Sequence, residues 1–99
     1  YHLSVGEKKR VAIATVLSMH PKVLVLDEPT AGLDPRGRRE LFDLLNKLPQ
    51  TMIIATHDLD FVEKLTTRTI VISRGRIVAD GLTSDILQNE EFLTSVGLK

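Results

Sequence analysis

The sequence predicts an α/β fold with a mostly parallel sheet, flanking helices and a C-terminal β-hairpin. Residues 23–26 form an unbroken run of valine and leucine, which is typical of a strand covered on both faces of a parallel sheet. A leucine-striped helix and a second apolar strand follow, and such a strand–helix–strand unit joins parallel neighbours. Two alternating segments, residues 70–73 and 76–79, flank Arg74-Gly75 and predict the hairpin.

The first helix is predicted over residues 5–19. Ser4 followed three residues later by Glu7 has the spacing of a capping box, in which the hydroxyl and the carboxylate satisfy backbone N–H groups of the first turn. Apolar residues then recur at helical spacing until His20-Pro21 ends the pattern. These apolar residues are Ile13, Val16 and Leu17.

A second helix is predicted after the turn of residues 29–35. Asp34 can cap this helix, and Pro35 suits its first position because the N–H that proline lacks would have no partner there. The apolar stripe of the helix stops at Pro49, and the second strand, residues 51–55, comes soon after. The stripe consists of Leu41, Leu44, Leu45 and Leu48.

Shorter features complete the predicted chain. Asp58 can cap a short helix after the second strand. Asp80-Gly81 predicts a further turn after the hairpin. Two short helices are expected in the tail, with Ser84 and Asp85 as candidate caps.

The composition is that of an ordinary globular chain and gives no sign of a polyanionic partner. Lysine and arginine number 13, and so do aspartate and glutamate, so the formal net charge is zero and no nucleic-acid partner is expected. With no cysteine in the sequence, a disulfide scaffold and a thiolate zinc site are excluded. The sequence starts with Tyr1 instead of Met, shortly before a helix start, which leads us to expect a fragment.

Two acidic side chains follow the first predicted strand. Asp27 and Glu28 come at its carboxyl end, where open α/β sheets place their ligands. Asp27 can hold Mg²⁺ directly or through water, and Glu28 can orient or deprotonate an attacking water. The alternative explanation for this pair is an ordinary acidic turn after a strand.

Three further residues are candidates for contact with a phosphate. His57 ends the neighbouring strand and can aim an imidazole N–H at a phosphate oxygen, or it can be a helix cap or a solvated turn residue. Ser4 and Gly6 offer a hydroxyl and N–H groups at a helix start, which suit a phosphate, or else Ser4 acts only as a cap. The basic clusters are expected to be solvated and to bind no ligand. These clusters are Lys8-Lys9-Arg10 and Arg36-Arg38-Arg39.

The order of these segments resembles the motif series of ATP-binding cassette (ABC) ATPases. Residues 3–7, Leu-Ser-Val-Gly-Glu, resemble the signature, and residues 23–30, Val-Leu-Val-Leu-Asp-Glu-Pro-Thr, resemble the Walker B strand. Residues 31–35 are similar to the D-loop and residues 53–58 to the switch-histidine segment. The resemblance covers essentially all 99 residues and implies a partial P-loop NTPase-like fold, the C-terminal part of one nucleotide-binding domain.

The resemblance implies a role for most of the candidate residues. In this family two cassettes hold ATP between them head to tail, so Ser4 and Gly6 are expected to contact the γ-phosphate held by the partner. Asp27 is expected to serve Mg²⁺, Glu28 the attacking water and His57 the γ-phosphate.

The chain also departs from the family pattern. Val5 stands where the family most often has glycine, and Glu7, a further candidate nucleotide contact, stands where it often has glutamine. Asp34 is expected to communicate across the dimer. The sequence has no segment of the form G-x-x-x-x-G-K-[ST], the Walker A loop that cradles phosphates, so this chain alone is expected to hold ATP poorly and to be inactive.

The finer resemblance concerns membrane transport. Residues 6–14 and 77–81 look most like the energising subunits of cobalt and nickel importers. This implies an ATP-hydrolysing subunit, peripheral on the cytoplasmic face of a membrane, that binds transmembrane transporter subunits and a second ABC ATPase subunit. The alternatives are a genome-maintenance or ribosome-associated ABC ATPase and a non-catalytic truncated ABC module.

Overall fold

The structure, a computed structural model, describes residues 3–99. Tyr1 and His2 lie outside the described residues. The expectation of a fragment, which was drawn from Tyr1, therefore concerns a residue that the structure does not describe. The chain divides into two compact units, the first ending at Thr56 and the second being His57–Lys99, and each is described by itself.

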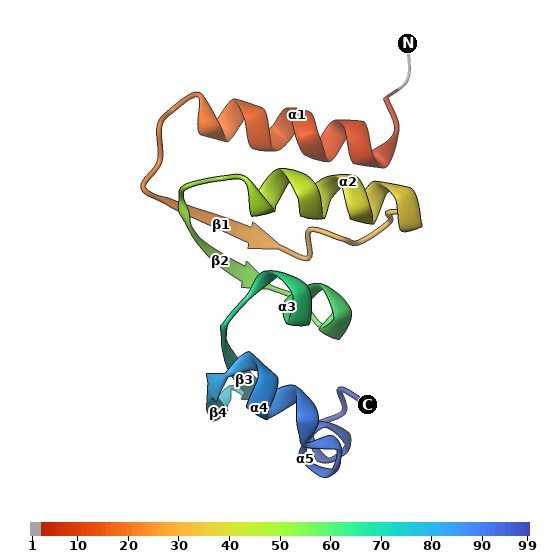
Figure 1. The fold of residues 1–99 in the computed structure, drawn as a ribbon, viewed down its shortest axis with the longest axis vertical. Coiled ribbons are helices and arrows are strands. Elements are labelled where there is room, and N and C mark those ends of the chain that lie inside the picture. The colour runs from red at the N-terminus through yellow and green to blue at the C-terminus, as the bar shows by residue number, and fades with distance from the viewer. Residues whose placement is uncertain (1–2) are drawn as a thin grey trace. The chain divides into compact units, whose positions relative to one another are not determined.

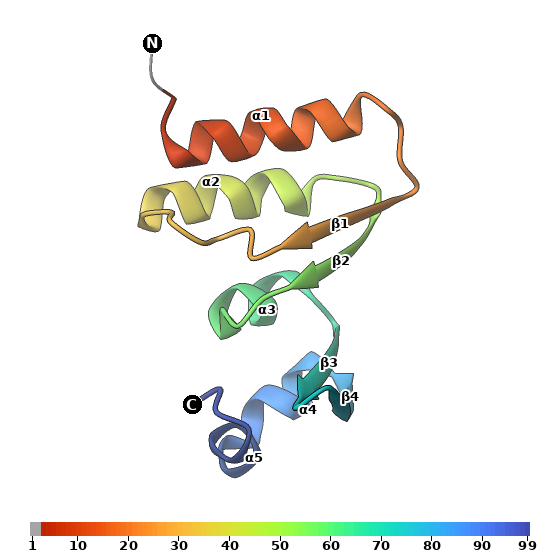
Figure 2. The same ribbon diagram turned by 180° about the vertical axis from the view of Figure 1, so that it is seen from behind.

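The first unit alternates helices and strands. Figures 1 and 2 show α1 and α2 running alongside each other, and β1 lying beside β2. The two strands pair in parallel, from Val23 opposite Thr51 to Asp27 opposite Ala55, which confirms the predicted strand–helix–strand unit. The elements are α1 (Val5–Leu17), β1 (Val23–Asp27), α2 (Pro35–Asn46) and β2 (Thr51–Ala55).

Both helices of the first unit begin where the sequence predicts. Ser4 caps α1 in a capping box with Glu7, and Asp34 caps α2 by accepting a 2.7 Å hydrogen bond from the Gly37 N–H. The helices end earlier than expected. The first stops at Leu17 instead of residue 19, and the second stops at Asn46, so Leu48 lies beyond it.

The core of the first unit lies on one side of the strand pair. Leu24 is 2% exposed, whereas Val25 is 68% and Ile53 59% exposed. The expectation that residues 23–26 are covered on both faces is therefore wrong, because alternate side chains of a strand point to opposite faces and only one face is packed here. The buried hydrophobic residues of this unit are Ile13, Leu24, Leu41 and Leu45.

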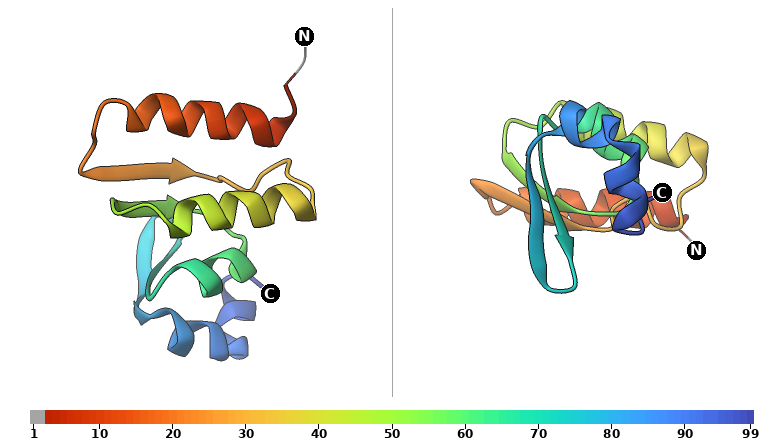
Figure 3. Two further views of the ribbon diagram at one scale, coloured as in Figure 1. Left: turned by 45° about the horizontal axis from the view of Figure 1, so that its top comes forward. Right: turned by 90° about the horizontal axis from the view of Figure 1, so that it is seen from below.

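The second unit contains the hairpin and three short helices. The hairpin is antiparallel, and its turn places Arg74 at φ 52° and Gly75 at φ 75°, both in the left-handed region that two-residue hairpin turns require. Figure 3 shows the tip of this hairpin standing clear of α4. The elements are α3 (Leu59–Leu65), β3 (Arg68–Ser73), β4 (Arg76–Leu82), α4 (Thr83–Gln88) and α5 (Glu90–Ser95).

Two local expectations for this unit are wrong. Asp80-Gly81 does not form a turn but lies inside β4, where the Asp80 carboxylate accepts hydrogen bonds of 3.0 and 2.9 Å from Nε and Nη2 of Arg68. Neither Ser84 nor Asp85 caps α4, since its N-cap is Leu82, which makes no side-chain cap bond. The core consists of Phe61, Val71 and Leu93.

None of the helices formed by residues 3–99 combines the length and the apolar character that a membrane span needs.

Candidate functional site

The predicted acidic pair lies at the end of the parallel strands. Asp27 is the last residue of β1 and is paired in register with Ala55, the last residue of β2, so both strands end at the same edge. The Asp27 side chain is exposed, and Glu28 follows it with a half-buried side chain. The sequence prediction that both acidic residues stand at a strand exit agrees with this geometry.

Glu28 has an unusual backbone that is held by several hydrogen bonds. Its φ is 45°, in the left-handed region that costs a non-glycine residue about 1–2 kcal/mol. The Glu28 N–H donates to the Ala55 carbonyl at 2.7 Å, and its carbonyl accepts from the Ala31 N–H at 3.2 Å. The Thr56 hydroxyl donates to Glu28 Oε2 at 3.2 Å. The first two bonds hold the backbone of Glu28, and the bond from Thr56 holds its carboxylate.

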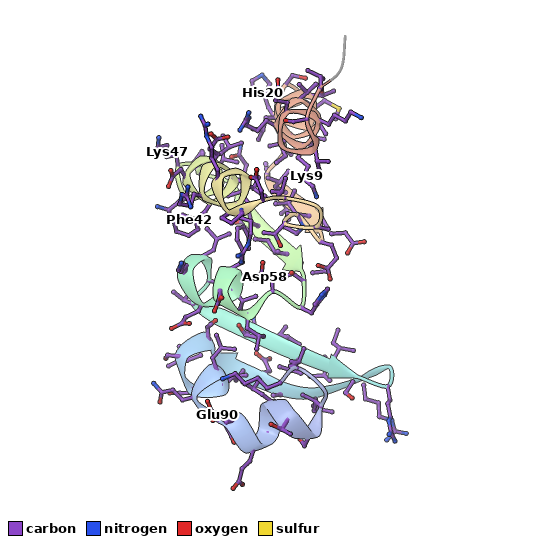
Figure 4. All side chains as sticks on the ribbon, turned by 90° about the vertical axis from the view of Figure 1, so that its right-hand side faces the viewer. Lys9, His20, Phe42, Lys47, Asp58 and Glu90 are labelled. Atoms are coloured by element: carbon purple, nitrogen blue, oxygen red, sulfur yellow. The ribbon has the colours of Figure 1, made fainter. Side chains whose placement is uncertain are left out.

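Lys9 also contacts Glu28, which the sequence did not predict. Its Nζ donates to the Glu28 carbonyl oxygen at 3.2 Å, and Figure 4 shows that Lys9 lies on the side of α1 that faces β1. The two residues are 19 positions apart, so no local pattern connects them. Lys9 and Thr56 are the residues of this site that sequence reasoning missed.

A cleft of about 400 Å³ brings together four other predicted site residues. It lies between the start of α1 and the start of α2, and it is lined by Ser4, Gly6, Glu7 and Asp34 among others. The Ser4 hydroxyl accepts from the Glu7 N–H at 3.1 Å, and the Ser4 N–H donates to Glu7 Oε1 at 3.3 Å. The carboxylate of Glu7 thus serves the capping box, while the Ser4 hydroxyl keeps its own proton to donate.

The start of α1 retains backbone groups that suit an anion. The first intrahelical bond of α1 runs from the Lys8 N–H to the Ser4 carbonyl at 2.9 Å, and Glu7 gives its N–H to the cap. The N–H groups of Val5 and Gly6 come before these bonds, at the positive end of the helix dipole. This arrangement suits the phosphate contact expected for Ser4 and Gly6.

A cluster of charges joins the two helices that flank the cleft. Arg10 of α1 pairs with Glu40 of α2, and Arg36 donates from Nε to Glu40 Oε1 at 3.1 Å. Hydrogen bonds from Arg10 and then from Arg36 hold the pKa of Glu40 below its usual range. The expectation that the basic clusters are solvated holds for Arg36, whose side chain is 82% exposed, and is wrong for Arg10 and Lys9, which are half-buried and bond to other elements.

Val5, which departs from the family pattern, is half-exposed and lies near Gly32, in the segment that resembles a D-loop. Gly32 has φ 77°, and a Cβ built on it would lie 3.4 Å from Cγ1 of Val5. A Cβ at this distance would make an ordinary contact, so the positive φ, which glycine adopts without strain, is the reason for glycine here.

His57 opens the second unit. Its side chain is exposed, and it directly precedes Asp58, which caps α3 by accepting from the Phe61 N–H at 3.2 Å. The cap confirms the predicted helix start at Asp58. The other predicted site residues, Ser4, Gly6, Glu7, Asp27, Glu28 and Asp34, all belong to the first unit.

The acidic side chains at the strand end fit Mg²⁺ only if phosphates and water supply most of its ligands. Among residues 3–99 there is no group of three or more histidine or acidic side chains that could form a complete metal cage. Mg²⁺ in nucleotide enzymes is usually bound by one or two carboxylates together with phosphates and water. The exposed Asp27 carboxylate at the strand end meets that requirement.

The chain matches a known family over most of its length. Residues 1–63 match the family described as "AAA domain, putative AbiEii toxin, Type IV TA system". The chain therefore belongs to this AAA-domain family.

Individual relatives are more specific. The chain is 60% identical, over all of its length and 41% of the relative's, to the "Putative ABC transporter ATP-binding protein gll0289" of Gloeobacter violaceus. It is 47% identical, over 99% of its length and 37% of the relative's, to the energy-coupling factor transporter ATP-binding protein EcfA of Methanoculleus marisnigri. The chain thus spans about two fifths of the length of these relatives.

Solved structures show the same likeness. The cbiO1 protein of Clostridium perfringens, described as part of the ABC transporter complex cbiONQ, matches with a TM-score of 0.79 and 48% identity, over 98% of this chain and 40% of that one. MJ1267, an ATP-binding cassette of an ABC transporter, matches with a TM-score of 0.83 and 30% identity, over 97% and 40%. The chain is accordingly similar to part of an ABC transporter ATPase, and it has an α/β fold of that kind.

Proposed function

We propose that this chain provides the catalytic carboxylate and the signature surface of an ABC-type ATPase that drives a membrane transporter. One observation carries the proposal: the Thr56 hydroxyl holds the carboxylate of Glu28 at the edge where both parallel strands end. The relatives, which are ABC transporter ATP-binding proteins, support the same reaction. The chain is the C-terminal part of one nucleotide-binding domain in this proposal.

The acidic pair divides the work at the strand ends. Asp27 is the residue that would hold Mg²⁺, and the ion, when bound, neutralises charge on the phosphates of ATP. Glu28 accepts a proton from the attacking water, for which a fixed carboxylate direction is needed. His57 donates to the γ-phosphate.

In this proposal the cleft at the starts of α1 and α2 contacts a second ATP molecule, not the one at Asp27 and Glu28. Ser4 and Gly6 donate to the γ-phosphate held by a second ATPase subunit, which is bound head to tail. Glu7 supports this contact by holding the helix start, since its carboxylate and N–H both bond to Ser4. Asp34, which lines the same cleft, transmits the state of one subunit to the other.

The proposal also covers where the subunit is located and which ion its transporter imports. The likeness to cbiO1 and to EcfA supports a subunit that is peripheral on the cytoplasmic face of a membrane and bound to transmembrane subunits. We infer import of cobalt or nickel from the resemblance of residues 6–14 and 77–81. Uptake of labelled Co²⁺ or Ni²⁺ by cells that carry the transporter, compared with the Glu28→Gln variant, tests this step, and uptake that does not change would exclude it.

Hydrolysis itself is tested in the complete ATP-binding subunit that carries this sequence. Glu28→Gln is expected to lower ATP turnover by 10²-fold or more, as loss of a general base does. The variant should still bind ATP, so an ATP-bound dimer should accumulate and be visible by size-exclusion chromatography.

The matched control is Glu91→Gln, which makes the same change at an exposed position of α5. This variant should keep wild-type turnover. Equal turnover in the Glu28→Gln and wild-type proteins would contradict the proposed role, and it would favour a non-catalytic module instead.

A further inference from the structure

We propose that Lys9 is a positioning residue for Glu28, acting through the Glu28 backbone and not on substrate. The inference rests on the proposed function of Glu28. Lys9 Nζ lies 3.2 Å from the Glu28 carbonyl oxygen, while its neighbour Lys8 is exposed and makes no contact with this turn among the bonds described for residues 3–99.

The carbonyl that Lys9 contacts belongs to a strained residue. Glu28 has φ 45° and is followed by Pro29, and the ring of a proline restricts the residue before it to extended conformations. A residue in such a conformation persists only where its surroundings determine it. The ammonium of Lys9 supplies a charge-assisted hydrogen bond to the carbonyl oxygen, the stronger kind of bond.

The other hydrogen bonds described for Glu28 hold other atoms or come from its own turn, so the contact from Lys9 has a different effect. The Ala55 carbonyl holds the N–H of Glu28, and Thr56 holds Oε2. On the carbonyl oxygen, Ala31 donates from within the same turn, whereas Lys9 donates from α1. Lys9 therefore ties the peptide after Glu28 to a rigid helix, and this contact limits rotation of the carboxylate-bearing residue.

The first test follows the Glu28 backbone directly by amide hydrogen exchange in the complete subunit. Lys9→Met keeps most of the side-chain stem and removes the ammonium. We expect the Glu28 amide, which bonds to the Ala55 carbonyl, to exchange roughly threefold faster or more in this variant. Lys9→Arg should restore the protection, and Lys8→Met should leave it unchanged.

The second test measures ATP hydrolysis by the same variants. Lys9→Met is expected to lower kcat by about tenfold with KM for ATP within about twofold, because the direction of a general base affects the chemical step and not substrate binding. In a Glu28→Gln background, Lys9→Met should cause no further loss, since a residue that acts through Glu28 has nothing left to position.

The outcomes separate this proposal from the proposed function. Glu28 amide exchange equal in Lys9→Met and Lys8→Met would overturn the positioning role whatever the activity. A further loss of kcat in the Glu28→Gln background would overturn it as well, because Lys9 would then act independently. Wild-type turnover that does not depend on Glu28 would instead refute the proposed function, and the exchange measurement would still decide the role of Lys9.

Discussion

Glu28 combines a costly backbone with a fixed carboxylate. A left-handed residue before proline is disfavoured on two counts, by its own Cβ and by the proline ring. Stability alone would favour glycine at this position, whereas a proton acceptor requires a carboxylate there. The strain is therefore a cost of keeping a functional side chain at the strand end.

A pair of substitutions isolates this strain. Glu28→Gly and Glu28→Ala both remove the carboxylate, but only glycine adopts φ 45° freely. We expect the glycine variant to have the larger free energy of unfolding, by about 0.5–1 kcal/mol in urea denaturation. The same pair at Asp27, in regular strand, should reverse the order, since glycine weakens a strand relative to alanine. The same order at both positions would contradict a strained Glu28.

At the scale of elements, a charge cluster links α1 to α2 beside the cleft. Glu40 accepts from Arg10 of the other helix and from Arg36 one turn earlier on its own helix. The cleft contains residues from the starts of both helices, so its shape depends on how these helices sit against each other. The Arg10–Glu40 pair is a charged contact that spans them.

Acid should weaken this link. Since Arg10 and Arg36 lower the folded-state pKa of Glu40, the pair stabilises the fold above about pH 4.5, and this stabilisation is lost as the pH falls through the folded-state value. Arg10→Met is expected to raise the pKa of Glu40 in a carboxyl NMR titration. It should also lower the free energy of unfolding more at pH 7 than at pH 3.

The control for this titration is Arg39→Met, at an exposed neighbouring position of α2. It should leave the pKa of Glu40 where it is in the wild-type protein. A Glu40 pKa that responds equally to both arginine substitutions would mean that general charge, and not the described contact, sets its value.

Local patterns predicted the elements of this chain better than its tertiary contacts. The strand at residues 51–55 and the caps Ser4, Asp34 and Asp58 are confirmed, because each depends on a few neighbouring residues. The turn expected at Asp80-Gly81 is wrong because the antiparallel ladder continues through both residues, opposite Ile70 and Thr69, a pairing that local turn preference does not reveal.

The candidate site shows the same division. Asp27 and Glu28 were predicted from their place after a strand, and the parallel register brings them to a shared edge. Lys9 and Thr56 were missed because they reach Glu28 over 19 and 28 positions of sequence. Only a folded chain brings such residues together, so periodicity and capping rules carry no signal for them.

At the scale of the whole chain, one face of the parallel strand pair is apolar and exposed. Val23, Val25 and Ile53 are exposed side by side on β1 and β2, where a water-exposed apolar face favours association. We expect the isolated 99-residue chain to form dimers or aggregates at micromolar concentration. Val25→Thr should lower the mass measured by light scattering.

Val78→Thr is the matched control, since it makes the same change at an exposed position of the hairpin. It should leave the measured mass near that of the wild-type chain. A wild-type chain that stays monomeric with a sharp unfolding transition would contradict association through the strand pair.

The two groups of site residues, the cleft and the strand ends, are expected to serve different nucleotides in a head-to-tail dimer. The test uses the complete subunit with either Ser4→Arg, which places a bulky cation at the helix start, or Glu28→Gln. Each variant alone should be inactive, because each homodimer has the same lesion at both sites. In a mixed dimer, the intact Glu28 of one subunit faces the intact Ser4 of the other. One site is then whole and the second carries both lesions.

Random mixing of the two variants should therefore regain up to about a quarter of wild-type turnover, from half of the dimers being mixed and one site in two being intact. A site built from Ser4 and Glu28 of the same subunit gives the opposite result, since every site in the mixture would then carry one lesion. A turnover in the mixture no higher than in either variant, with mixed dimers demonstrated by differently tagged subunits, would refute the shared site. The complementation assay thus distinguishes a site within one subunit from a site between two.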